Sequence, residues 1–164
     1  GCIESFESLV GQFEKPLYRF LLAKTRNHHQ AEDLLQETFL ITYRKLNQFN
    51  PVYPFSSWIF TIANRLAISY FRKHKPMQEE YDIPTYKTPR CEVMAAETSQ
   101  TLWAKARCLL SSNHYAALWL FYNERMTIEQ VAQTMNRKPN SVKVWLHRAR
   151  KRLAQEFKPR PSMP

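Results

Sequence analysis

Positively charged side chains at helical spacing have the clearest chemistry in this sequence. They lie between Thr127 and Leu153, where two short helical patterns meet at a turn. In the second pattern the apolar residues form one stripe and cations occupy the rest of the circumference, which suits binding to a polyanion. The cationic positions are Lys143, His147, Arg148, Arg150, Lys151 and Arg152.

The same stretch has the signals of a helix-turn-helix. Thr127 and Gln130 match a capping box, in which each side chain satisfies a backbone N–H of the first turn. Pro139 interrupts the pattern, and a second helix restarts at Asn140. The second helix of such a motif can enter the major groove of DNA. On the pattern alone, the solvated basic face of an ordinary domain is the alternative.

Composition disfavours an enzyme. The chain has two glycines and no GxxxxGK[ST] or GxGxxG motif, so a nucleotide-binding loop is not expected. No nucleophile with a base, carboxylate pair or metal cluster stands out, and we expect no catalytic residue, metal or cofactor. Cys2, Cys91 and Cys108 lack metal-ligand spacing, and we interpret them as reduced thiols. His28 and His29 are expected in a solvent-facing connection.

Hydropathy argues against a membrane protein, and charge favours a polyanionic partner. The longest apolar run, Tyr115 to Tyr122, is far shorter than the roughly 20 residues of a membrane helix, and no secretory signal opens the chain. We therefore expect a cytoplasmic protein without direct membrane insertion. The net charge of +10 is uneven, because residues 1–75 carry ten Lys or Arg against six Asp or Glu, and residues 114–164 carry ten against three.

Apolar spacing predicts an all-α fold of two small helical domains joined by a proline-containing linker, the second domain with the helix-turn-helix. The predicted domains are residues 1–75 and 95–164, with residues 76–94 as the linker. Pro16 is tolerable only at a kink or a helix start, so the stretch that contains it is expected to be helical, with a helix broken at Pro16 as the alternative. Before the helix-turn-helix, the predicted helices cover residues 6–21, 30–46, 57–74 and 91–110, and another begins at Ser111–Ser112.

Two features of the first domain have both a structural and a functional interpretation. Acidic and polar residues of the helix at 30–46 share one face, which is either solvated or available to a basic partner. In the loop at 47–57, three rings lie among prolines, and they either plug the core or stack on unpaired bases while the basic helix that follows holds the phosphates. The rings are Phe49, Tyr53 and Phe55.

Three motifs in sequence resemble the two-domain bacterial sigma factors of the extracytoplasmic-function (ECF) group. They are Ala31 to Phe39; Phe55 to Ile59 with Ile62, Ala63, Arg72 and Lys73; and Thr127 to Ala132 with Ser141 to Lys143 and His147 to Arg150. The resemblance covers roughly residues 4–157. It implies a subunit that binds core RNA polymerase, reads duplex −35 promoter DNA through its second domain, and opens and reads the single-stranded −10 element through its first.

The resemblance also assigns residues to three interfaces. Polymerase contacts fall on Asp33, Gln36, Glu37 and Leu40. Contacts to −10 DNA fall on Asn50, Tyr53, Phe55, Ser56, Arg65, Ser69, Arg72 and Lys73. Contacts to −35 DNA fall on Asn140, Ser141, Lys143, Val144, His147, Arg148 and Arg150, of which Lys143 and His147 would read base edges.

The chain departs from the family pattern at some of these positions. Arg65 and Ser69 stand where Asn or an acidic residue is common, which leaves the −10 preference open. Val144 and Trp145 replace small polar and basic residues, so −35 readout would be partly apolar. The resemblance further implies an anti-sigma protein as regulator and no small-molecule substrate. A two-domain helix-turn-helix regulator that acts without core polymerase is the alternative function.

Overall fold

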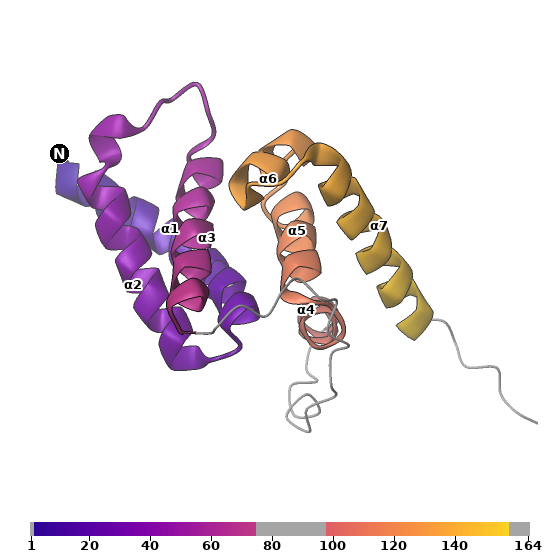
Figure 1. Cartoon of the computed structure of the whole chain (residues 1–164). Helices are drawn as coiled ribbons and strands as arrows, with labels where there is room; N and C mark the ends of the chain where they lie inside the picture. Colours follow the sequence, from indigo (N-terminus) through magenta and orange to yellow (C-terminus); the bar gives the residue numbers. More distant parts are fainter. Residues whose placement is uncertain (1, 75–97, 158–164) are drawn as a thin grey trace, which may run out of the picture.

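The computed structural model describes residues 2–74 and 98–157, and all regular structure in these ranges is helical (Figure 1). The predicted linker at 76–94 and the start of the helix predicted at 91–110 lie outside the described residues. The helices form two groups. The N-terminal bundle holds α1 (Cys2–Thr25), α2 (His28–Arg44), a 3-10 turn (Leu46–Gln48) and α3 (Phe55–His74), and the C-terminal bundle holds α4 (Thr98–Leu109), α5 (Ser112–Tyr122), α6 (Ile128–Met135) and α7 (Pro139–Glu156).

α1 is one continuous helix with Pro16 inside it, so the helix predicted here is confirmed and the alternative of a break at Pro16 is excluded. Pro16 has no N–H, and the carbonyl of Gln12 therefore loses its helical donor. Gln12 is exposed, however, and water can satisfy that oxygen. Leu17, Phe20 and Leu21 are fully buried, and each contributes about 1.5–3 kcal/mol, which offsets the lost hydrogen bond.

α2 begins at His28, earlier than predicted, because Asn27 caps the helix. The Asn27 side chain accepts a hydrogen bond from the backbone N–H of Gln30 at 3.1 Å. His28 and His29 therefore belong to the first turn of the helix rather than to a connection, and His28 Nδ1 lies 2.7 Å from the Tyr18 hydroxyl. The side of α2 toward the bundle core buries Ala31, Leu34, Leu35, Thr38 and Thr42.

α5 is the centre of the C-terminal bundle, and every residue from His114 to Leu120 is buried. The predicted capping box is confirmed, since the N–H of Thr127 donates to Gln130 Oε1 at 2.8 Å and the N–H of Gln130 donates to Thr127 Oγ1 at 3.2 Å. α6 ends at Asn136, whose φ of 52° is left-handed, and Pro139 then occupies the first turn of α7. The capping box, the left-handed residue Asn136 and Pro139 therefore set where the two helices of the helix-turn-helix begin and end.

One cysteine differs from the sequence-based expectation. Cys108 of α4 is disulfide-bonded, so the interpretation of all three cysteines as reduced thiols is wrong for this residue. Sequence spacing does not show which Cβ atoms the fold brings within bonding distance. Within the described ranges no helix is long and apolar enough to cross a membrane.

The two bundles pack directly against each other. α3 contacts α6, and α1 contacts α5 (Figure 1). α5 therefore lies between α1 on one side and α6 and α7 on the other, which explains why its whole circumference is apolar. The sequence predicted two domains but not this contact between them.

Candidate nucleic-acid interface

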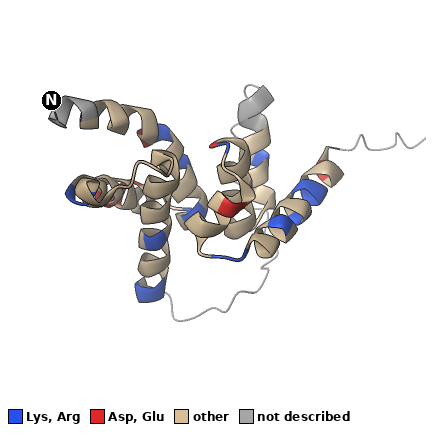
Figure 2. Ribbon diagram, turned by 90° about the horizontal axis from the view of Figure 1, so that it is seen from above, with Lys and Arg blue, Asp and Glu red and all other residues tan. Residues whose placement is uncertain are grey.

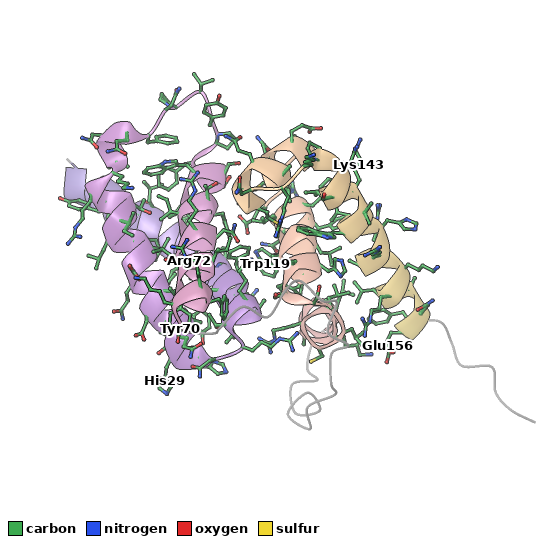
Figure 3. The ribbon with its side chains drawn as sticks, viewed as in Figure 1. His29, Tyr70, Arg72, Trp119, Lys143 and Glu156 are labelled. Atoms are coloured by element: carbon green, nitrogen blue, oxygen red, sulfur yellow. The ribbon has the colours of Figure 1, made fainter. Side chains whose placement is uncertain are left out.

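α7 separates its apolar and cationic residues as predicted. Val142, Leu146, Ala149 and Leu153 are buried against the rest of the bundle. Lys143 projects from the outer side of α7, away from the N-terminal bundle (Figure 3). Basic residues recur along α7 and at the end of α3 when the molecule is seen from above (Figure 2). The other predicted −35 positions are Asn140, Val144, His147, Arg148 and Arg150, all exposed, and Ser141, half-buried.

Trp145 supports the turn of the helix-turn-helix, a role that the sequence did not reveal. Its ring lies 5.8 Å from the guanidinium carbon of Arg137 and 6.2 Å from the His114 ring. This cation–π contact holds the exposed Arg137 beside the amino end of α7. Arg150 is also restrained, because its Nε donates to the carbonyl of Leu146 at 3.2 Å.

The aromatic loop contains both a packed cluster and an exposed ring. The ring centroids of Phe49, Phe55 and Trp58 lie 5.2–5.5 Å apart, and Phe13 of α1 lies 5.5 Å from Phe55. Tyr53 is 54% exposed at the loop tip, beside Val52 at 80%. Phe55 and Tyr53, which the sequence grouped together, therefore occupy different environments.

Asn50 gives the loop its shape. Its side-chain Oδ1 accepts from the N–H of Val52 at 3.0 Å, and its carbonyl accepts from the N–H of Tyr53 at 3.1 Å. The loop then leads into α3, on which Arg65, Arg72 and Lys73 are exposed; Ser56 and Ser69 are half-buried. The structure thus places an exposed ring and exposed cations along one helix and the loop before it.

The predicted docking residues share one solvent face of α2. Asp33, Gln36, Glu37 and Leu40 are all exposed, and Leu40 is 57% exposed. Tyr43 on the same helix is also 51% exposed and meets Phe6 edge-on at 5.1 Å. Large apolar side chains beside carboxylates on a surface are typical of protein interfaces.

The amine of Lys24 in α1, where the two bundles meet, has a strongly lowered pKa. Burial, together with the smaller effect of the Arg137 charge on the other bundle, lowers its pKa from 10.5 to about 8. Its Nζ lies 5.5 Å from the centre of the Phe20 ring.

In the described ranges no group of three or more His, Cys, Asp or Glu is placed to hold a metal ion.

Two family models match the chain. The model for sigma-70 region 2 matches residues 9–76, which include α2, the aromatic loop and α3, and the model for sigma-70 region 4 matches residues 114–153, which include the helix-turn-helix. The fold and the exposed faces therefore define a two-domain sigma factor.

The similar proteins found by comparison are sigma factors. The chain is 30% identical over 148 residues to the ECF sigma factor SigL of Mycobacterium tuberculosis, covering 87% of this chain and 82% of that protein. It is 29% identical to SigM of Bacillus subtilis, covering 91% and 93%. The sigma factor RpoE of Bartonella quintana, solved with the anti-sigma factor NepR, has a similar fold with a TM-score of 0.71 and 22% identity, covering 93% of this chain and 96% of that one.

The chain belongs to the ECF group of RNA polymerase sigma factors. It acts with core RNA polymerase and directs promoter recognition. Members of this family are DNA-binding subunits of the transcription machinery rather than enzymes.

Proposed function

We propose that α2 docks on core polymerase through Asp33, Gln36, Glu37 and Leu40. The proposal is supported by the exposure of all four residues on one face of α2, which combines two carboxylates with a large apolar side chain. α7 presents the opposite charge at the far side of the molecule (Figure 2). One chain thus offers an acidic and apolar face for a basic protein partner and a basic face for DNA.

α7 reads the −35 element, with two classes of contact. Lys143, Val144 and His147 lie on the exposed face that would enter the major groove, and they contact base edges. The turn and the remaining predicted positions hold phosphates and set the register. These positions are Asn140, Ser141, Arg148 and Arg150, to which we add Arg137.

The loop and α3 open and hold the −10 element. Tyr53 stacks on an unpaired base, because it is the exposed ring of the loop, whereas Phe55 supports the loop from the packed cluster. Asn50 and Ser56 shape this site, and α3 follows the phosphates of the strand. Its contacts are Arg65, Ser69, Arg72 and Lys73.

The role as a sigma factor also suggests a regulatory partner, a cellular location and the absence of catalysis by this chain. The similar protein RpoE was solved in complex with the anti-sigma factor NepR, and the similar protein CnrH was solved in complex with the cytosolic domain of CnrY. We propose an anti-sigma protein as a partner of this chain too. The protein works in the cytoplasm, where polymerase and chromosome are found. It needs no cofactor and catalyses no reaction, since polymerase carries out the chemistry.

Co-purification with core polymerase tests the docking proposal and separates it from a regulator that works without polymerase. Glu37→Lys replaces attraction by repulsion and should weaken core binding by about 1–3 kcal/mol. Glu32→Lys makes the same charge change on α2 outside the proposed contact set and is the matched control. Equal loss in both variants, or no loss for Glu37→Lys with intact circular dichroism, would contradict the assignment.

A further inference from the structure

Val144 of α7 is an apolar side chain on a helix face that is otherwise polar or charged. It is 46% exposed. Its neighbours along the helix surface are Asn140 and Arg148, each four residues away, and His147, three residues away, and all three are exposed. Val144 therefore lies in the middle of the residues proposed to contact the −35 element.

Packing on the opposite side of α7 sets the direction in which Val144 points. Val142 and Leu146 are buried, and each lies two residues from Val144, which is slightly more than half a turn of an α-helix. Trp145 is half-buried against the core, and its ring centroid lies 6.2 Å from that of His114. These contacts prevent α7 from rotating about its axis, so Val144 stays on the outer side.

The side chain of Val144 also has a restricted conformation. A valine in a helix has one strongly preferred χ1 rotamer, so its two methyl groups lose little conformational freedom when a ligand covers them. The side chain has no hydrogen-bonding group, and it stabilises a complex only by covering apolar surface. Val144 thus presents a small and rigid apolar surface to a ligand of α7.

The major groove of duplex DNA presents one methyl group, the C5-methyl of thymine. The other groups that distinguish the base pairs there are hydrogen-bond donors and acceptors. Against cytosine, Val144 would remove water from the N4 amine without replacing its hydrogen bond, which is unfavourable. Contact with Val144 therefore favours thymine and disfavours cytosine at the same place in the groove.

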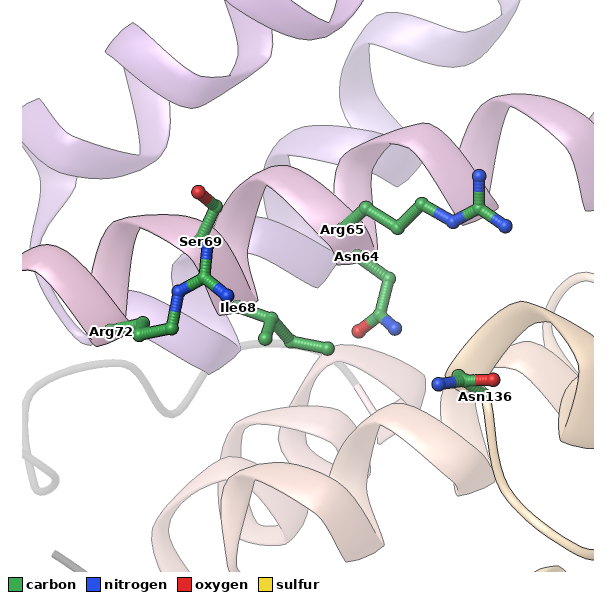
Figure 4. Close-up of a pocket in the computed structure, with 6 residues that line it drawn as sticks. All are labelled: Asn64, Arg65, Ile68, Ser69, Arg72 and Asn136. Atoms are coloured by element: carbon green, nitrogen blue, oxygen red, sulfur yellow. The ribbon is translucent and has the colours of Figure 1, made fainter. Parts of the chain in front are cut away.

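Ile68 of α3 is another exposed aliphatic side chain among cations, but its surroundings differ. It lines a cavity of about 250 Å³ that Asn136 of the helix-turn-helix bounds on the other side (Figure 4). Asn64, four residues earlier on α3, donates from Nδ2 to the Thr134 carbonyl of α6 at 3.0 Å. Ile68 therefore faces another part of the chain, whereas Val144 faces outward from α7.

We propose that Val144 contacts the C5-methyl group of a thymine in the −35 element and thereby sets the preferred base at one position. The inference rests on the proposed role of α7 in reading the −35 element, and it adds the chemical group that is recognised. Lys143 and His147 contact hydrogen-bonding groups on base edges, and Val144 beside them contacts the methyl group.

Binding by the reconstituted holoenzyme, the full-length chain with core polymerase, tests the proposal. Selection from randomised duplex fragments first identifies the preferred −35 sequence. Each thymine in it is then replaced singly by deoxyuridine, which lacks only the C5-methyl group, and affinities are compared by competition. One replacement should weaken wild-type binding about 3- to 5-fold, the effect of removing one methyl group from an apolar contact.

Two variants assign the effect to Val144. Val144→Ser removes both methyl groups and should reduce the ratio of thymine to deoxyuridine affinity to about 1, and the fold should be retained because the position is exposed. Phe157→Ser is the matched control, because it removes an exposed apolar side chain at the end of α7 outside the proposed contact set. This control should keep the wild-type ratio.

Three results would overturn the assignment to Val144. They are a wild-type holoenzyme that distinguishes thymine from deoxyuridine at no −35 position, a Val144→Ser protein that keeps the wild-type ratio, and an equal loss of the ratio in Val144→Ser and Phe157→Ser. Failure of the wild-type holoenzyme to enrich any −35 sequence would instead overturn the proposed role of α7, and this inference with it.

Discussion

Replacing Tyr53 by Ala should impair promoter opening without destabilising the protein. The ring is 54% exposed, and no ring contact involves it among the described residues, so the free energy of unfolding should change by less than about 0.5 kcal/mol. Stacking on an unpaired base is worth about 1–3 kcal/mol, which corresponds to about 5- to 150-fold in the population of open promoter. Permanganate reactivity of thymines near the start site measures that population in the reconstituted holoenzyme.

Phe55→Ala is the matched comparison for Tyr53→Ala. Phe55 meets three rings, those of Phe13, Phe49 and Trp58, at 5.3–5.5 Å, and at about 0.5–1.5 kcal/mol per pair its loss should destabilise the protein by about 1.5–4.5 kcal/mol. Urea denaturation measures this difference. A pre-melted bubble template should restore part of the transcription lost in Tyr53→Ala. Normal opening by that variant, or destabilisation equal to that of Phe55→Ala, would refute a stacking role for Tyr53.

Two further predictions concern α7 and Lys24. Lys143→Ala should reduce the base preference at one or two −35 positions, whereas Arg150→Ala should weaken binding to all DNA sequences alike and reduce the salt dependence of binding. Binding assays on a series of −35 mutant DNAs test this difference. The reverse pattern would show that the helix is rotated in the groove. Lys24 has a pKa of about 8 in the folded chain against its ordinary 10.5, so between pH 8 and 10 the unfolded chain holds more protons and the free energy of unfolding should rise with pH. Lys24→Met should lose that rise in urea denaturation, and an equal slope in both proteins would contradict burial of this amine.

The sequence predicted the helical elements well where side-chain signals are local. The capping box at Thr127, the stripe from Val142 to Leu153 and the cap at Ser111 depend on residues within one or two turns, and the structure contains each of them. The alternative of a break at Pro16 stayed open because the cost of a proline is visible in the sequence, whereas the buried face that offsets this cost is not.

The candidate site was harder to predict because exposure depends on long-range packing. Tyr53 and Phe55 are both aromatic residues beside proline, and only their contacts with α1 and α3 separate them. Asn64 has no motif of its own, and its acceptor on Thr134 lies 70 positions away. Its role as a contact between bundles could therefore come only from the structure.

The wholly apolar circumference of α5 has a consequence for solubility. α6 and α7 remain with α5 when the bundles separate, but α1 does not, so opening exposes an apolar strip to solvent. An opened chain without a protein to cover that strip can associate with other opened chains. A protein that covers this strip of α5 after the bundles separate would therefore keep the chain soluble.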